Sequence, residues 1–392
     1  MSFSQALSGL RVSAESLNVV SNNIANARTV GFKSTSIRFA DVYSDSRVGM
    51  GVKVGGLVQN FGAGNQETTN RNLDLAISGN GFFRLTQNDQ TVYSRNGQFS
   101  MTKDGHLINA QGAKLTGYNR GVAPGTAPEA IRIPADGIQA QPTSNVDAAF
   151  NLDARVDEVD PNNFDPDDPT TYSYVSNVSV YDSLGTRQDV RIFFFKTGEN
   201  DWQAGIMIDG DDDVRDLQDV EFNADGTLSA ATVLSFNFDP GTGANEVEFE
   251  LDLTGTTQFA NNFEVSSMVQ NGYTSGSLLR LNVNEQGQIM GTYTNDQQQV
   301  LGTLALASFQ NNEGLRAIGN NVWSETADSG SPIIGIPGQA QFGQIASGVV
   351  EASNVDLNQE LVDLIIAQRN YQANAQSIRT QDEVLQTTVN LR

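Results

Sequence analysis

Cysteine is absent from the 392-residue sequence, and histidine occurs once, at position 106. The first absence excludes a disulfide framework and a catalytic thiol. The opening residues, MSFSQALSGL, contain neither a basic region nor a continuous apolar run, so we expect no cleaved Sec-type signal peptide. A run of about 18 apolar residues, the signature of a membrane-spanning helix, is also missing. Such a chain is either a cytosolic protein or one exported unfolded by another route, where a stray thiol would be a liability.

Basic residues are scarce in the middle of the chain. Between Val146 and Gln270 there are 26 acidic and 5 basic residues, whereas the remaining 267 residues carry 20 and 18. This block therefore holds almost all of the net charge of −23. It repels nucleic acid and anionic membranes as well as copies of itself, so we expect it to face solvent. The nearly neutral remainder is the part that can pack against identical neighbours.

Little in the sequence supports catalysis or cofactor binding. One histidine and no cysteine leave no convincing nucleophile and base pair, and nothing among the 46 acidic residues selects a glycosidase pair. The best metal candidate is DGDDDVRDLQDVE, Asp209–Glu221, which resembles a calcium loop but has Val214 where the loop requires glycine. We therefore expect an acidic solvated loop, with weak calcium binding as the alternative. We predict no enzyme and no cofactor.

Both ends of the sequence have the spacing of long amphipathic helices. Near the N-terminus the spacing alternates between four and three residues at Phe3, Leu7, Leu10, Ala14, Leu17, Ser21 and Ile24. The last 36 residues continue such a pattern without Gly or Pro, and Asp356 is a suitable N-cap. Val362, Ile365 and Ile366 add apolar surface beside this seam. Pairing of the two helices could close one globular domain, but we expect further copies of the chain to cover this surface.

The region between the helices reads as β-structure. Runs such as GFFRL, DVRIFFF and VEFELDL are bounded by turn residues, and Gly105, Gly226 and Gly287 mark three similar hairpin turns. The fold class is therefore α+β, with mainly β domains nested in the chain and flanked by coiled-coil-like helices. We expect a terminal helical inner domain at 1–30 and 355–392, an irregular glycine-rich connector at 31–70 and 321–354, a middle β domain at 71–145 and 271–320, and an acidic outer β domain at 146–270.

Three motifs resemble those of one protein family. SNNIANARTVGFKS (residues 21–34), RNLDLAISGNGFFRL (residues 71–85) and the segment from Glu351 to Arg392 are similar, in this order, to the signatures of bacterial flagellar rod and hook proteins. The stretches FADVY, VGMGVKV and VYSRNGQF, together with the long middle insertion, resemble the hook branch of this family.

The resemblance implies a structural role. Hook-type subunits leave the cell unfolded through the type III export apparatus and polymerise under a cap into a curved, flexible tube, a universal joint that passes motor torque to the filament. The implied partners are further copies of the chain, the hook cap, the distal rod and hook–filament junction proteins, with no nucleic acid and no membrane insertion. The implied location is extracellular, in the hook attached to the basal body. The alternatives are a distal rod-type protein and a secreted β-rich adhesin with a helical stalk.

Two sets of residues follow from this hypothesis. We expect contacts between subunits at Leu7, Leu10, Leu17, Asn22, Asn23, Ile24, Asn26, Leu361, Leu364, Ile365, Tyr371, Ile378 and Leu385. The asparagines combine helix termination with amide groups that can bond to a neighbour. A bending tube also requires hinges, for which glycine is suited because its backbone is permissive. We expect these at Gly55, Gly56, Gly272 and Gly276.

Overall fold

The computed structural model describes residues 3–42, 50–134, 136–208, 214–241 and 243–390. The chain divides into two compact units. Unit 1 comprises Met1–Ala135, Arg280–Thr292 and Gln298–Arg392, and unit 2 comprises Asp136–Leu279 and Tyr293–Gln297. Unit 2 contains 28 acidic and 5 basic residues, whereas unit 1 contains 18 of each. The whole net charge of the chain therefore resides in unit 2.

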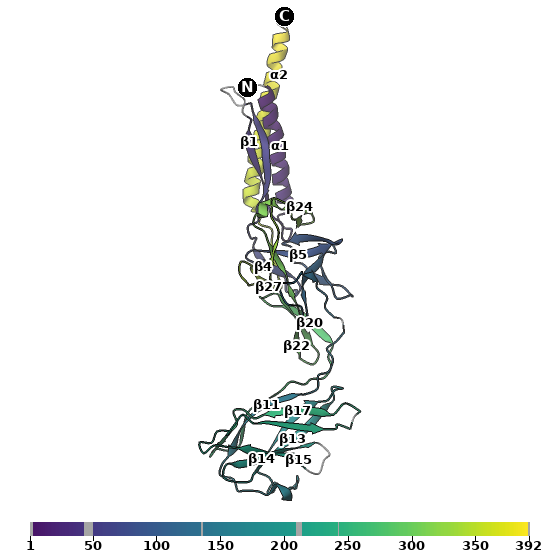
Figure 1. The fold of residues 1–392 in the computed structure, drawn as a ribbon. Helices are drawn as coiled ribbons and strands as arrows, with labels where there is room; N and C mark the ends of the chain where they lie inside the picture. The colour runs from purple at the N-terminus through teal and green to yellow at the C-terminus, as the bar shows by residue number, and fades with distance from the viewer. Residues whose placement is uncertain (1–2, 43–49, 135, 209–213, 242, 391–392) are drawn as a thin grey trace. The chain divides into compact units, whose positions relative to one another are not determined.

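Unit 1 contains both helices, α1 (Phe3–Ala25) and α2 (Leu357–Asn390), which pack against each other (Figure 1). The N-cap prediction for α2 is confirmed, because the carboxylate of Asp356 accepts hydrogen bonds from the backbone N–H groups of Asn358 and Gln359 at 2.9 and 3.3 Å. Helix α1 ends at Ala25, among the asparagines that were expected to terminate it. Within the described residues, no helix combines the length and apolarity needed to cross a membrane.

The α1–α2 contact uses small side chains rather than the expected leucine seam. The buried residues of α1 are Ala6, Val12, Ser13, Val20 and Asn23. A Cβ atom at Gly9 would lie 2.8 Å from Oδ1 of Asn374, so a larger residue there would displace this side chain. On α2, Ala367 is the apolar residue buried at this contact. The leucines of α1 consequently remain only half-buried in the chain.

The segment expected to be an irregular connector contains an ordered antiparallel hairpin, β1 (Thr35–Asp41) and β2 (Val52–Gln59). Both strands contact α1. Gly55 and Gly56 are part of β2, where Gly56 pairs with Arg38 and the register shifts at the next pair. Gly56 is thus held by strand pairing, whereas Gly55 is the residue that the register skips, as in a β-bulge.

The rest of unit 1 is a β body built mainly on a sheet whose central order is β20-β21-β22-β9-β5-β6-β25-β24. Its core includes the aromatic side chains of Phe82, Tyr93, Phe309 and Trp323. The strands are β3 (Gln66–Thr68), β4 (Leu75–Ser78), β5 (Phe82–Gln87), β6 (Gln90–Ser94), β7 (Ser100–Met101), β8 (Leu107–Ile108), β9 (Lys114–Asn119), β10 (Glu129–Ala130), β20 (Leu278–Val283), β21 (Gln288–Tyr293), β22 (Gln298–Leu304), β23 (Leu306–Ser308), β24 (Arg316–Gly319), β25 (Val322–Ser324), β26 (Ile333–Gly335), β27 (Gln344–Ser347) and β28 (Val349–Glu351). A short 3-10 helix, η2 (Asn312–Gly314), interrupts them.

Unit 2 is a two-sheet β structure. One sheet has the order β12-β13-β14-β15, and the other has the order β16-β17-β11-β18, with β19 paired to β11. The bounds are β11 (Asn145–Asp153), η1 (Pro161–Asn163), β12 (Tyr174–Tyr181), β13 (Arg187–Lys196), β14 (Asp201–Ile208), β15 (Arg215–Glu221), β16 (Val233–Phe238), β17 (Val247–Asp252), β18 (Thr257–Phe259) and β19 (Glu264–Gln270).

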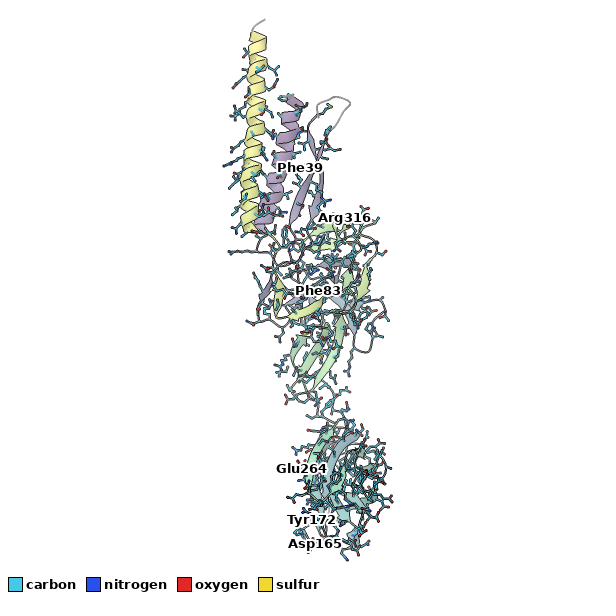
Figure 2. All side chains as sticks on the ribbon, turned by 90° about the vertical axis from the view of Figure 1, so that its left-hand side faces the viewer. Phe39, Phe83, Asp165, Tyr172, Glu264 and Arg316 are labelled. Atoms are coloured by element: carbon cyan, nitrogen blue, oxygen red, sulfur yellow. The ribbon has the colours of Figure 1, made fainter. Side chains whose placement is uncertain are left out.

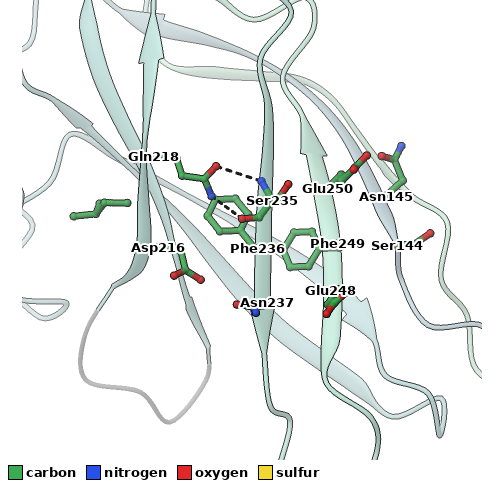
Figure 3. Close-up of a pocket in the computed structure, with 11 residues that line it drawn as sticks. Ser144, Asn145, Asp216, Gln218, Ser235, Phe236, Asn237, Glu248, Phe249 and Glu250 are labelled. Atoms are coloured by element: carbon green, nitrogen blue, oxygen red, sulfur yellow. Dashed lines mark hydrogen bonds between the residues drawn. The ribbon is translucent and has the colours of Figure 1, made fainter.

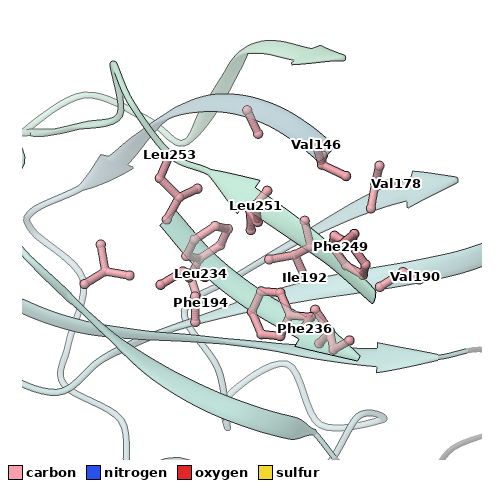
Figure 4. Packing of buried hydrophobic residues seen from close by; sticks show 14 of the residues in the cluster. Val146, Val178, Val190, Ile192, Phe194, Leu234, Phe236, Phe249, Leu251 and Leu253 are labelled. Atoms are coloured by element: carbon pink, nitrogen blue, oxygen red, sulfur yellow. The ribbon is translucent and has the colours of Figure 1, made fainter. Parts of the chain in front are cut away.

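The unit 2 core draws alternate residues from both sheets, among them Ile192, Phe194, Phe236, Phe249 and Leu251 (Figure 4). The intervening residues Phe193 and Phe195 are buried in a second cluster on the other face of β13, together with Phe164 and Tyr172. Both faces of β13 are therefore covered, which explains its unbroken apolar run.

The three predicted hairpin turns are confirmed. Gly105, Gly226 and Gly287 all have positive φ, at 81°, 80° and 73°. In each turn the glycine N–H donates to the carbonyl three residues earlier, on Thr102, Asn223 and Asn284 respectively.

Two glycines of unit 2 that were expected to act as hinges are closely packed instead. A Cβ atom at Gly272 would lie 2.2 Å from Oγ1 of Thr143, and one at Gly276 would lie 2.8 Å from the side chain of Asn295. The segment around them pairs with residues 138–141 through isolated bridges. Close approach to the backbone of Thr143 is therefore a reason for glycine at position 272, whereas the contact at Gly276 is with a side chain. The expectation that both act as hinges stays a prediction.

Candidate functional site

The candidate functional site is the surface of the two terminal helices. Leu361, Ile365, Tyr371 and Leu385 of α2 are exposed, while Leu364 and Ile378 are half-buried. On α1, Leu7, Leu10, Leu17 and Ile24 are half-buried, Asn22 is exposed and Asn26 is half-buried. Most of the expected interface residues are therefore accessible in the single chain.

The most pronounced apolar surface lies near the start of α2. Leu361, Val362, Ile365 and Ile366 retain 47–51% of their side-chain exposure, although all four are large and aliphatic. A solitary exposed leucine needs no explanation, but four neighbouring ones on adjacent turns form a contiguous patch. We call these four residues the α2 patch.

The β1–β2 hairpin adds apolar surface next to α1. Phe39 and Leu57 are 53% and 56% exposed, and Figure 2 shows Phe39 on the hairpin beside the helices. A groove of about 610 Å³ between this hairpin and α1 is lined by apolar Leu7 and Leu57 and by charged Arg11 and Glu15. The hairpin and α1 thus present one mixed surface.

Asn23 differs from the other two asparagines of its motif because its side chain is buried within the chain. Its Nδ2 donates to the carbonyl of Thr35 at 2.8 Å and to Oε1 of Glu360 at 2.9 Å, and its Oδ1 accepts from the N–H of Thr35. Both N–H groups of this amide are used within the chain and the residue is only 2% exposed, so we leave Asn23 out of the surface offered to a neighbouring subunit. Asn26 bonds to Asn22 and thereby helps to end α1.

Below the helices, a set of buried charges joins segments that are distant in sequence. Nζ of Lys33 lies 2.6 Å from Oε1 of Glu351, and Nη1 of Arg95 lies 3.2 Å from Oε2 of the same carboxylate. All three side chains are at most 6% exposed. We call these three residues the junction triad. Burial lowers the pKa of Lys33 and of Arg95, and the carboxylate of Glu351 opposes both shifts.

The contacts around the junction triad explain the Gly-Phe-Lys sequence near the end of the first motif. Gly31 has a φ of 69°, and a Cβ atom there would lie 2.5 Å from the backbone N of Asn96. Phe32 is buried beside it, and Lys33 reaches the carboxylate. Sequence reasoning missed all three charged residues. The signal was a lysine directly after an apolar Gly-Phe, but its partners lie too far along the chain to be identified by spacing.

Unit 2 holds an open groove of about 950 Å³. Asp216, Glu248 and Glu250 line it, and the amide of Gln218 bridges β15 to β16 by bonding both backbone groups of Ser235 (Figure 3). Among the described residues, no group of three or more acidic, histidine or cysteine side chains is arranged to hold a metal ion. The calcium candidate lies partly outside the described residues, since Asp209, Asp211 and Asp213 are not included, and its end, Arg215–Glu221, forms β15.

Family models match four parts of the chain. They are described as flagella basal body rod protein at residues 5–33, flagellar hook protein FlgE/F/G D1 domain at 76–148, flagellar basal body protein FlaE D2 domain at 151–273 and flagellar basal body rod FlgEFG protein C-terminal at 346–391. Flagellar hook protein FlgE of Escherichia coli (strain K12) is 43% identical over 405 residues, covering 100% of both chains. The chain belongs to the flagellar hook protein family.

Other comparisons with hook proteins agree. Flagellar hook protein FlgE of Borreliella burgdorferi is 32% identical over 441 residues, covering 98% of both chains. The crystal structure of the Helicobacter pylori flagellar hook protein FlgE2 superposes with a TM-score of 0.56 at 14% identity, over 73% of this chain and 100% of that one. This similarity supports the fold, and the full-length hook relatives favour a hook protein over the rod-type and adhesin alternatives.

Proposed function

We propose that the chain is a structural subunit of the flagellar hook and that many copies assemble into a curved, flexible tube. The tube acts as a universal joint that passes motor torque to the filament. A catalytic role forms no part of this function. The similarity to hook proteins along the full length supports the proposal, and the exposed surface of the terminal helices supplies its physical mechanism.

The α2 patch is the observation that carries the assembly mechanism. Full burial of a side chain such as Leu361 or Ile365 is worth roughly 1.5–3 kcal/mol relative to exposure. That free energy is not gained within one chain, because each of the four residues is about half exposed. Contacts with α1, α2 or the β1–β2 hairpin of neighbouring copies would recover it. The predicted interface residues, apart from Asn23, remain part of this proposal.

Charge supports a radial order in the tube. Unit 1 is neutral, so its copies can pack closely without repulsion, whereas unit 2 carries the whole net charge of −23. We therefore place the helices toward the tube axis and unit 2 toward the outside. The polar faces of the helices, with Asn18, Gln372 and Gln376, would give the channel a weakly charged lining suited to the passage of unfolded chains.

Bending must be taken up where rigid parts of the chain join. Given the close packing of Gly272 and Gly276, we infer that the chain flexes at the boundary between the units near residues 279–280. Gly55 and Gly56 remain candidates for small adjustments in the β1–β2 hairpin, where a Cβ atom at Gly56 would meet nothing within 4 Å.

The proposal extends to partners and location. We infer that the subunit is exported unfolded by the type III apparatus without a cleaved signal peptide. It would then join the hook outside the cell, beneath a cap, between the distal rod and the hook–filament junction. These partners are proposed from the family alone.

Electron microscopy of concentrated protein tests the assembly. We expect the full chain to form tubes and a chain shortened by residues 357–392 to remain a folded monomer, because it lacks the α2 patch. Full-length protein that stays monomeric at every concentration and salt condition would contradict the proposal. So would tubes formed equally well by the shortened chain.

A further inference from the structure

Glu351 stands at the point where the helical layer of unit 1 joins its β body. It is the last residue of β28 and precedes the N-cap of α2 by five residues. Its backbone carbonyl accepts from the N–H of Gly31 at 2.7 Å, and its Oε1 accepts from the N–H of Gly64 at 2.9 Å. Together with the ion pairs to Lys33 and Arg95, it binds the segment after α1, the segment after β2 and the β body at once.

The charges of the junction triad depend on the carboxylate. Lys33 and Glu351 are 318 residues apart, and Arg95 and Glu351 are 256 apart. Lys33 also donates to the carbonyl of Gly62 at 2.7 Å, and Arg95 to that of Gly79 at 2.8 Å, but neutral carbonyls do not balance a charge. Without the carboxylate, two cations would remain buried and uncompensated, which strongly disfavours the closed junction.

We propose that Glu351 is a positioning residue that fixes the pair of terminal helices on the β body and makes the docking of both chain ends a single event. The N-terminal segment carries a buried cation whose carboxylate partner, among the described residues, lies on the C-terminal segment, so each end docks stably only together with the other. This inference deepens the proposed function, since helices held in a fixed orientation are what neighbouring copies would recognise.

Asn354 reinforces the same junction without charge. Its Oδ1 accepts from the N–H of Ser34 at 2.8 Å, and its Nδ2 donates to the carbonyls of Asn60 and Gly62 at 2.8 and 3.1 Å. These bonds lie on the same segments that Glu351 connects. The amide adds hydrogen bonds, whereas the carboxylate supplies the long-range charge dependence that the proposal rests on.

The first test is segment-resolved hydrogen exchange of the full chain carrying Glu351→Gln. This change keeps the side-chain shape and an oxygen that can accept from Gly64, but removes the negative charge. We expect protection to fall together in 3–34 and 357–390, by at least about tenfold, while strands β5, β6 and β9 keep their protection. A tenfold change corresponds to about 1.4 kcal/mol. Glu313→Gln is the matched control, because its ion pair with Arg38 is exposed.

The second test distinguishes charge balance from a general loss of stability. Lys33→Met added to Glu351→Gln removes one of the two unbalanced cations, so we expect the double variant to regain part of the lost protection. Loss of protection in one helix alone, simultaneous loss in the β body, or additive effects in the double variant would overturn the proposal. Tube formation is scored separately by microscopy: failure of the unmodified chain to assemble contradicts the hook function, whereas the exchange pattern decides the role of Glu351.

Discussion

The side-chain amide of Asn23, on α1, donates a 2.9 Å hydrogen bond to Oε1 of Glu360, on α2. The two residues lie 337 positions apart, and the bond links the end of α1 to the start of α2. Partial burial raises the pKa of Glu360, with a further contribution from Asp363 and opposition from Asn23. The helix pair therefore contains a carboxylate whose ionised form is disfavoured in the docked state.

The first prediction concerns pH. Because the pKa of Glu360 is higher in the folded chain than in the unfolded chain, docking should strengthen as the pH falls through the raised pKa toward about 4.5. Glu360→Gln should remove this part of the pH dependence and leave the bond from Asn23 intact. Thermal unfolding of the helical circular dichroism signal at pH 7 and pH 5 measures the effect. Equal pH dependence in the variant and the unmodified chain would contradict it.

The second prediction concerns the first motif. Gly31→Ala should destabilise unit 1 by about 2–4 kcal/mol, because the new Cβ atom would meet the backbone of Asn96 at positive φ. Gly121→Ala is the control: its φ is 81°, but nothing lies within 4 Å of the added atom. That variant should lose only about 1 kcal/mol. Denaturant titration compares the two, and equal losses would show that packing at Gly31 is unimportant.

The third prediction separates assembly from folding. Ile365→Asp should abolish tube formation, because it places a charge in the α2 patch, which the proposed contacts would bury. Since Ile365 is half exposed in the single chain, the monomer should lose no more than about half of the roughly 1.5–3 kcal/mol that full burial provides. Gln372→Asp introduces the same charge at another exposed position of α2 and should interfere less. Sedimentation measures how much protein assembles, and a thermal melt measures the stability of the monomer.

The fourth prediction concerns unit 2 in acid. Hydrogen bonds from the side chain and backbone of Arg155 lower the pKa of Asp153 to about 2. A lowered folded pKa means that this stabilisation is present above the unfolded value of 3.8 and is lost as the pH falls toward 2. Asp153→Asn should therefore weaken unit 2 at pH 6 but change it little near pH 2. Denaturant titrations at the two pH values measure the stability of each variant, with exposed Asp157→Asn as the control. Equal losses for Asp153→Asn at both pH values would contradict the prediction.

Part of this architecture could be predicted from the sequence because its signals are local. The heptad spacing at both ends, the N-cap at Asp356 and the three glycine turns each depend on residues a few positions apart. The α+β class followed from them. Local signals did not identify which face of α1 packs against α2, because the helix has one stripe of leucines and another of small residues. The leucine stripe is more apolar, but the stripe with Ala6, Gly9 and Ser13 permits the closer approach.

The junction could not be predicted for a different reason. Lys33, Arg95 and Glu351 come together only in the folded chain, and no spacing rule links residues hundreds of positions apart. Asn23 was expected to face a neighbouring subunit because an amide at a helix end can serve either role, and only the fold shows that Thr35 and Glu360 satisfy it. Gly272 and Gly276 illustrate the same limit, since glycine serves flexibility and tight packing equally well.

A three-dimensional reconstruction of the assembled tube from electron micrographs tests the central claim most directly. The account predicts that the α2 patch is buried between copies near the tube axis and that unit 2, with its net charge of −23, lies at the outer radius. A map in which unit 2 lines the channel, or in which Leu361, Ile365 and Ile366 remain exposed to solvent, would contradict it.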